Sequence, residues 1–208
     1  MTLLTPRRPR LAIAGGLLAA LTATLSATGV LRFVDQYAVD HWMPWLEVRH
    51  HPFVTLGSLT VPSLPPPALN TALELWTYPA AVLPSLLVVL AAARRLARPA
   101  AIAWCILWLV GDAIELAGKL TLHKPDLYRH AIHVTAFGTS LPSGHTIRAL
   151  ILAGALASAS RWGRIALVWA ATVPFALVVG GAHTPSDVVT GAFVVLTLAA
   201  WAPNVRRE

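Results

Sequence analysis

Charged residues and cysteine are scarce in this 208-residue chain, and each shortage excludes a class of protein. Only 12% of the residues are charged, about half the share found in a typical soluble domain. With 56% hydrophobic residues, the chain cannot cover a soluble fold with polar groups, and it lacks the composition of a disordered protein. Its one cysteine, Cys105, excludes a disulfide framework and a cysteine-based zinc site. A membrane protein remains.

Six apolar stretches predict transmembrane helices, because a helix needs about 20 apolar residues to cross a bilayer core. The first stretch is longer than the apolar core of a signal peptide, roughly 7–15 residues, so we expect a retained helix. The expected fold class is therefore an all-α polytopic membrane protein with six transmembrane helices. The stretches cover roughly residues 11–33, 71–93, 100–120, 145–160, 165–182 and 188–203.

Segment 34–70 is the one long connection between these stretches, and it is too polar to span. It contains Trp42 and Trp45, and tryptophan favours the membrane–water interface. We therefore expect an extracytoplasmic interfacial arm with a short helix. No internal repeat divides the chain, so a single domain over residues 1–208 is predicted.

Ten of the 16 lysines and arginines lie in alternate connections or at the ends of the chain, and thus on one side of the membrane. Positively charged connections stay in the cytoplasm, so both termini are expected there, in the cell membrane. The net charge of +7 is then explained by the orientation of the chain in the membrane, and no nucleic-acid partner is expected. The ten residues are Arg7, Arg8, Arg10, Arg94, Arg95, Arg98, Arg161, Arg164, Arg206 and Arg207.

All eight histidines lie in or beside segments expected on the opposite, extracytoplasmic side. Any histidine chemistry would therefore face away from the cytoplasm. The histidines are His41, His50, His51, His123, His130, His133, His145 and His183.

The tetrapeptide Pro142-Ser143-Gly144-His145 directly precedes the fourth stretch. A helix that starts here points free N–H groups and the positive end of its dipole outward, which favours an anion. Gly144 lets an oxyanion approach the backbone closely, and His145 in the first turn is placed to transfer a proton. The alternative is that the tetrapeptide only starts a helix.

A second motif, His183-Thr184-Pro185-Ser186-Asp187, joins the fifth and sixth stretches. The turn lets the Asp187 carboxylate reach the His183 imidazole, which fixes the tautomer and leaves the other ring nitrogen nucleophilic. Alternatively, Ser186 or Asp187 caps the sixth helix, and both roles are compatible.

Three charged residues of the third stretch, Asp112, Glu115 and Lys119, fall on one helical face. Carboxylates inside a span usually face the bundle interior or a water-filled cavity. We expect Glu115 to pair with Lys119 and orient it, with Asp112 deeper, and we favour structural roles for both carboxylates. Alternatively, Lys119 only extends to the interface.

These motifs resemble those of the type 2 phosphatidic acid phosphatase superfamily of integral membrane enzymes. The superfamily's second motif is intact at Pro142 to His145, its third motif keeps His183 and Asp187, and Lys119 fits the lysine of its first motif. The resemblance covers residues 100–200, the expected catalytic core.

Two arginines of the superfamily's pattern are replaced here. Asp126 stands where the first motif has arginine, although Lys124-Pro125 precedes it, and Leu177 stands at the arginine of the third motif. Lysine does not reproduce the bidentate geometry of arginine on phosphate. Arg148, one turn after His145, is the best substitute, unless it pairs with Glu115 or Asp112.

The resemblance implies dephosphorylation of a lipid through a phosphohistidine, with no metal and no cofactor. His183 is then the nucleophile, Asp187 its orienting acid and His145 the proton donor and acceptor. The implied phosphate-binding residues are Lys119, Lys124, Ser143, Gly144 and Arg148.

The implied substrate is a phospholipid, or a polyprenyl phosphate or diphosphate such as undecaprenyl phosphate. Two alternatives stay open: a non-catalytic relative that binds a lipid phosphate, and a phosphotransferase that passes the phosphoryl group to a second lipid.

Overall fold

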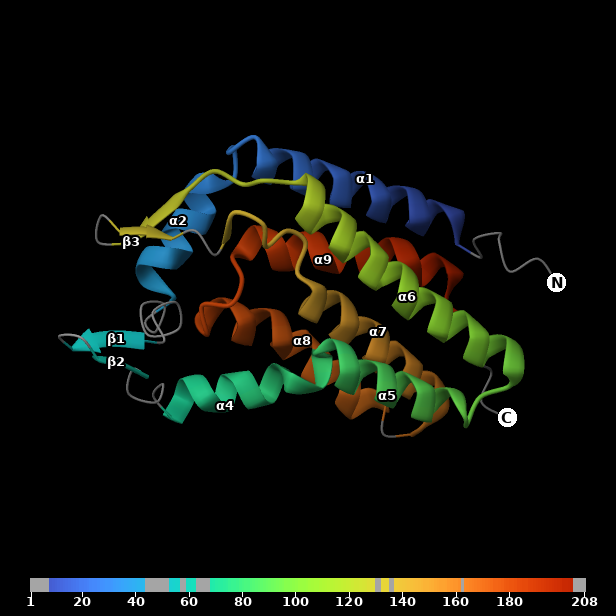
Figure 1. Cartoon of the computed structure of the whole chain (residues 1–208). Coiled ribbons are helices and arrows are strands. Elements are labelled where there is room, and N and C mark those ends of the chain that lie inside the picture. Colours follow the sequence, from blue (N-terminus) through green and yellow to red (C-terminus); the bar gives the residue numbers. More distant parts are fainter. Residues whose placement is uncertain are drawn as a thin grey trace.

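In a computed structural model, the described residues are 8–43, 53–56, 59–62, 68–129, 132–134, 137–161 and 163–203. Most of them form a bundle of helices that run in roughly one direction or its reverse, while the helix over residues 32–41 runs across that direction (Figure 1). The helices are α1 (Pro9–Ala27), α2 (Arg32–His41), α4 (Ala68–Thr77), η1 (Tyr78–Ala80), α5 (Val82–Ala93), α6 (Arg98–Thr121), α7 (Gly144–Ala159), α8 (Gly163–Val179), α9 (Pro185–Leu198) and η3 (Ala199–Trp201).

Two of the predicted stretches are interrupted. The first ends early, because α1 stops at Ala27 before Gly29, whose φ of 83° is the left-handed conformation that ends helices, and α2 then begins at Arg32. The second is a bent pair, with an angle of 47° between residues 71–80 and 82–93. The break falls at the short η1 turn, which contains Pro79. The other four predicted stretches each correspond to one helix, from α6 to α9.

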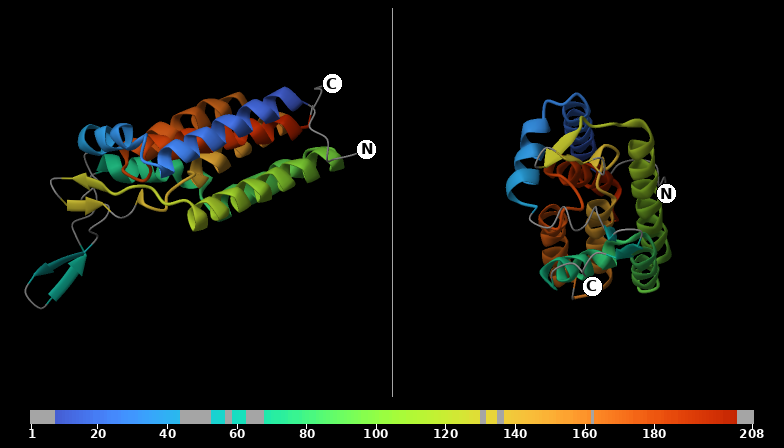
Figure 2. Two further views of the ribbon diagram at one scale, coloured as in Figure 1. Left: turned by 90° about the horizontal axis from the view of Figure 1, so that it is seen from above. Right: turned by 60° about the vertical axis from the view of Figure 1, so that its left-hand side comes forward.

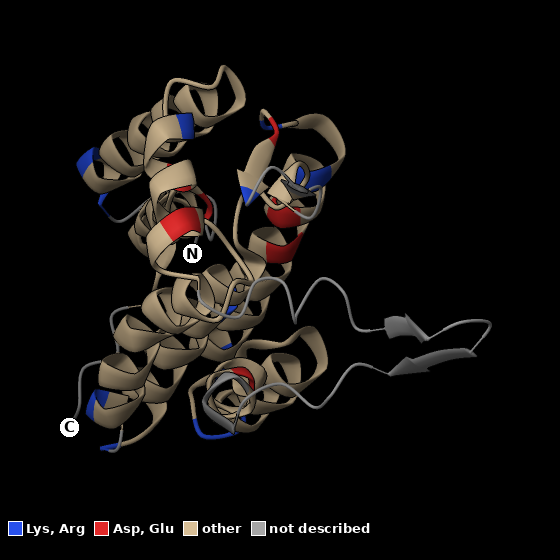
Figure 3. Cartoon of the chain, turned by 90° about the vertical axis from the view of Figure 1, so that its left-hand side faces the viewer, with Lys and Arg blue, Asp and Glu red and all other residues tan. Residues whose placement is uncertain are grey.

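Two helices, α1 and α6, are long and apolar enough to cross a membrane, and the bent pair makes a third. Helices α7, α8 and α9 are apolar but shorter. Large apolar side chains on the outer faces are exposed, including Leu17 at 67%, Leu120 at 69% and Phe175 at 70%. Charged residues are sparse on the described helices (Figure 3). Exposed apolar faces on successive helices indicate a protein surrounded by lipid.

The all-α expectation is confirmed, and two small hairpins are added in the connections. Strands β1 (Phe53–Leu56) and β2 (Leu59–Pro62) lie within the segment expected as an interfacial arm, and α2 supplies a short helix near its start. Strands β3 (Leu127–Arg129) and β4 (Ile132–Val134) pair antiparallel in the connection between α6 and α7. Trp45 of the expected arm lies outside the described residues.

Helix α7 lies in the centre of the bundle and contacts α5, α6, α8 and α9. Close packing uses small residues: a side chain on Gly111 of α6 would meet Ile147, and one on Gly154 would meet Trp104. Helix α1 lies along α9 (Figures 1 and 2), where a side chain on Gly15 would come within 2.6 Å of the Thr197 backbone nitrogen.

The helix ends separate into two groups. The start of α1, the end of α9 and the α5–α6 and α7–α8 connections lie at one end of the bundle, the right-hand end in Figure 1. The end of α6 and the starts of α7 and α9 lie at the other end. The described arginines of the alternate connections therefore share one end, and the His145 and His183 motifs share the opposite end.

Candidate active site

The site forms where α7 and α9 begin side by side. Ser143 is the N-cap of α7, and its hydroxyl accepts hydrogen bonds from the Thr146 N–H at 3.4 Å and the Thr146 hydroxyl at 3.1 Å. The Ser143 N–H donates to the Asp187 carbonyl at 3.0 Å, which joins the two helix starts. A side chain on Gly191 of α9 would come within 2.8 Å of the Ser143 carbonyl oxygen, so glycine permits this approach.

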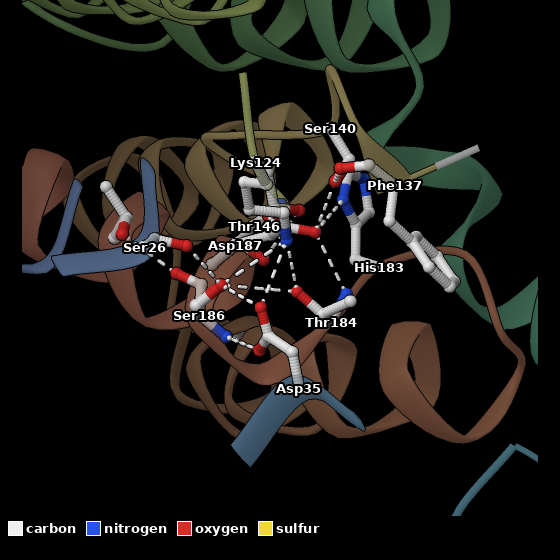
Figure 4. Close-up of polar contacts among 12 residues, drawn as sticks. Ser26, Asp35, Lys124, Phe137, Ser140, Thr146, His183, Thr184, Ser186 and Asp187 are labelled. Atoms are coloured by element: carbon white, nitrogen blue, oxygen red, sulfur yellow. Dashed lines mark hydrogen bonds and ion pairs between the residues drawn. The ribbon is translucent and has the colours of Figure 1, made fainter. Parts of the chain in front are cut away.

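The turn from α8 to α9 positions His183 against Asp187. Gly181 takes a positive φ of 67°, and the N–H groups of Ala182 and His183 both donate to the Leu177 carbonyl. His183 Nδ1 lies 3.4 Å from Asp187 Oδ2 (Figure 4). Asp187 also caps α9, because its Oδ2 accepts from the Thr184 N–H at 2.9 Å. The two sequence-based roles for Asp187 therefore coexist.

His145, in the first turn of α7, faces this pair. The centroids of the His145 and His183 rings lie 6.4 Å apart. His183 is 7% exposed and Asp187 is fully buried, while His145 is partly exposed. The two imidazoles thus face each other at the starts of α7 and α9, and one of them lies beside a carboxylate.

Asp187 is held by a cluster of buried charges that we call the Lys124 cluster: Asp35, Lys124 and Asp187. Lys124 Nζ lies 2.6 Å from Asp187 Oδ1 and 3.3 Å from Asp35 Oδ2 (Figure 4). It also donates to the Thr184 hydroxyl at 2.6 Å. Ser140 completes the surroundings of Asp187 by donating to Oδ2 at 2.7 Å. The side chains of all three charged residues are 4% exposed or less.

A second group, the Arg148 cluster, consists of Asp112, Glu115, Lys119 and Arg148. Arg148 pairs with Asp112 at 2.7 Å and with Glu115, and its Nε donates to the Ala80 carbonyl at 2.7 Å. Lys119 Nζ lies 2.5 Å from Glu115 Oε1. The expected Glu115–Lys119 pair is therefore present, and so is the alternative pairing of Arg148 with both carboxylates.

Glu115 also lies against the start of α7. A Cβ placed on Gly144 would fall within 2.0 Å of all three atoms of the Glu115 carboxyl group. The carboxylate thus occupies the space beside Gly144 where an anion would approach the helix N-terminus. Because Lys119 and Arg148 both bind this carboxylate, the Arg148 cluster adjoins the two histidines through Gly144.

All eight residues selected from the sequence therefore gather around the starts of α7 and α9: His145, His183, Asp187, Lys119, Lys124, Ser143, Gly144 and Arg148. Lys124 and Arg148 are each engaged by two carboxylates here, and their assignment to phosphate stays a prediction. Leu177, at the position of the superfamily's arginine, is 3% exposed in the apolar core.

Sequence reasoning missed Asp35 and Ser140. Asp35 lies in the segment expected as an interfacial arm, yet it is 3% exposed and contacts Lys124 and Ser186. The signal that could have identified it is its position directly after an apolar stretch, because carboxylates beside or within such stretches usually face the protein interior. Ser140 lies two residues before the Pro-Ser-Gly-His motif and had no signal of its own.

The described residues thus form a bundle of apolar helices in which the His183–Asp187 pair faces His145 at the N-terminus of α7. Residues 97–208 match the model of the PAP2 superfamily, and the chain belongs to that superfamily. No curated protein and no solved structure matches the chain. Membership supports a membrane-associated, phosphatase-type enzyme that acts on lipid phosphates.

Proposed function

We propose that the protein hydrolyses a phosphomonoester or diphosphate of a phospholipid or polyprenyl lipid on the extracytoplasmic side of the cell membrane. The observation that carries this proposal is the His183–Asp187 pair facing His145 across 6.4 Å at the start of α7. A site that only binds a phosphate has no need of a nucleophile with its own orienting acid.

In the first step, His183 Nε2 attacks the phosphorus atom. Its Nδ1 faces Asp187, so Nε2 is the ring nitrogen that is free to react. The N–P bond forms as the bond from phosphorus to the lipid oxygen breaks, and His145 in its protonated form gives its proton to that oxygen. His183 becomes a cationic phosphoimidazole, whose charge the Asp187 carboxylate stabilises.

In the second step, neutral His145 takes a proton from water as the water oxygen attacks phosphorus. The N–P bond breaks, inorganic phosphate leaves, and both imidazoles return to their starting states. Acceptance of the phosphoryl group by a second lipid would follow the same route with a lipid hydroxyl in place of water, which is the phosphotransferase alternative.

The phosphate is proposed to bind at the N-terminus of α7. Gly144, Lys119 and Arg148 surround the position that the Glu115 carboxylate now occupies. The Ser143 N–H donates to the Asp187 carbonyl, so Ser143 could bind phosphate only after giving up that bond. For the cations to bind phosphate, Glu115 must move aside, and a phosphoryl group with more negative charge than a carboxylate favours that exchange. Lys124 acts on this group through Asp187, which it contacts directly.

The test is release of phosphate by the purified protein from a panel containing phosphatidic acid, undecaprenyl phosphate and undecaprenyl diphosphate. We expect His183→Ala to abolish turnover and Asp187→Asn to reduce it by several orders of magnitude, as in other sites where an acid orients a histidine. His123→Ala, a change at an exposed histidine, is the matched control. Full activity of His183→Ala would exclude the phosphohistidine mechanism.

The products separate the alternatives. Free phosphate identifies a phosphatase, and a newly phosphorylated lipid identifies a phosphotransferase. Binding of phosphatidic acid without either product, in a folded protein, identifies a non-catalytic relative.

The side of the membrane is tested by cysteine labelling in a Cys105→Ser background. His123→Cys lies in the connection before the site, and Ala97→Cys lies between α5 and α6 at the opposite end of the bundle. In intact cells, an impermeant thiol reagent should label the first variant and spare the second. The reverse pattern would place the site in the cytoplasm.

A further inference from the structure

Asp35 comes from α2, outside residues 97–208 that match the superfamily, yet its carboxylate lies among the buried residues of the site. Its Oδ1 accepts from the Ser186 N–H at 3.0 Å, and its Oδ2 accepts from the Ser186 hydroxyl at 2.6 Å (Figure 4). Two hydrogen bonds from the first turn of α9 therefore fix the carboxylate beside Lys124. A structural anchor needs no such charge, because neutral groups make the same bonds.

The charges of the Lys124 cluster show what a second carboxylate adds. Lys124 with Asp187 alone would be neutral, and the ammonium would draw the Asp187 charge away from His183. With Asp35 included, the cluster of one cation and two carboxylates carries a net charge of −1. A site of low dielectric makes this difference larger than it would be in water.

That negative charge matches a need of the proposed reaction. The imidazole ring of His183 is neutral before attack and positively charged once the N–P bond has formed. A net charge of −1 on the Nδ1 side of the ring therefore meets an opposite ring charge only in the phosphorylated state, while the phosphoryl charge lies on the Nε2 side. An interaction that strengthens as the reaction proceeds raises the rate of the chemical step and leaves substrate affinity unchanged.

We propose that Asp35 is a positioning residue for the site: it balances the charge of Lys124, so that Asp187 keeps its full charge for His183. The catalytic part of this inference rests on the proposed function. The electrostatic part, that Asp35 strengthens the hydrogen bond between Asp187 and His183, stands without it.

The main experiment compares Asp35→Asn with the wild-type protein in detergent micelles. Asparagine keeps the shape of the side chain and can still accept a hydrogen bond from Ser186, but it removes the charge. With phosphatidic acid as the probe, we expect kcat to fall about 10- to 100-fold, the range typical of changes to residues that support a functional group through a hydrogen bond or charge. We expect KM to change less than about twofold. Asp40→Asn, the same change at an exposed position of α2, is the control and should keep the wild-type kcat.

A second measurement does not depend on turnover. The proton on His183 Nδ1 should give a downfield imidazole resonance in the proton NMR spectrum, assigned by its loss in His183→Ala. Asp35→Asn should move this resonance upfield because the acceptor carboxylate loses charge density to Lys124, and Asp35→Glu should restore part of the shift and part of kcat. A merely structural Asp35 would leave the resonance in place.

These readouts separate the possible failures. If the wild-type protein releases no phosphate from any lipid but the resonance moves in Asp35→Asn, the proposed function fails and the positioning role stands. If kcat and the resonance of folded Asp35→Asn both equal those of the wild-type protein, the positioning role is overturned. Should Asp35→Asn fail to fold, Ser186→Ala replaces it: loss of the hydroxyl that holds Asp35 should lower kcat about threefold with the same upfield shift, and wild-type values would overturn the proposal.

Discussion

The Lys124 cluster and the Arg148 cluster both place a cation between two carboxylates, but they differ in burial and in neighbours. Every charged side chain of the Lys124 cluster is 4% exposed or less. In the Arg148 cluster, the side chains of Asp112 and Lys119 are 21% and 39% exposed, and Glu115 lies against the backbone of the anion site at Gly144. A buried cluster holds its geometry, whereas a partly exposed one can exchange a carboxylate for another anion.

The largest expected effect comes from removing the buried cation. Lys124→Met leaves Asp35 and Asp187 facing each other without a positive charge, which should lower the free energy of unfolding by about 3–5 kcal/mol. The fall in Tm, followed by tryptophan fluorescence in detergent, should be about 6–20 °C.

Lys119→Met is the matched change in the other cluster. Its half-exposed ion pair is worth about 0.5 kcal/mol, so the Tm should change by only about 1–2 °C. Equal losses of stability in the two variants would show that the two clusters do not differ in the way their burial indicates.

Arg148→Ala should have a smaller effect on stability than Lys124→Met, about 2–3 kcal/mol, because Asp112 is partly exposed and Lys119 still binds Glu115. The same variant tests its assignment to phosphate. If Arg148 binds the phosphoryl group after Glu115 moves, inhibition by vanadate should weaken about tenfold in the folded protein. Unchanged inhibition would assign Arg148 to helix packing alone.

Glu115→Gln should give a smaller effect on anion binding than Arg148→Ala, and of the opposite sign. Removing the carboxylate charge beside Gly144 frees Lys119 and Arg148, so inhibition by inorganic phosphate should strengthen about fivefold, equal to about 1 kcal/mol. Glu74→Gln, at an exposed position of α4, is the control. Weaker inhibition by phosphate would mean that Glu115 supports the anion site instead of competing for it.

The comparison also explains which parts of the site the sequence predicts. His183 and Asp187 lie four residues apart, and His145 and Ser143 belong to one helix start, so local geometry brings each set together. Arg148 finds its partners on the neighbouring helix α6, and that pairing follows from charges that each face the bundle interior. These interactions depend on short segments or on adjacent helices.

Asp35 could not be predicted in the same way, because its partner Ser186 lies 151 residues further along the chain. The contact depends on where α1 ends, on the left-handed turn at Gly29 and on the direction in which α2 then runs. Likewise, Lys124 lies just before the arginine position of the superfamily's first motif, which indicated a phosphate ligand. The structure places its ammonium group between two carboxylates. Contacts of this kind are set by tertiary packing rather than by local pattern.

The packing of α1 along α9 has a consequence for biosynthesis. Ser26 of α1 donates a hydrogen bond to Ser186 of α9, 160 residues away in sequence. At a translation rate of roughly 5–20 residues per second, α1 enters the membrane about 10–30 s before its partner has been made. During that interval its serine and threonine hydroxyls have no α9 to contact, and Asp35 lacks its partner Ser186, although Lys124 is made earlier. The charged interior of the site is therefore completed only once α9 has been made, although its first carboxylate enters with α2.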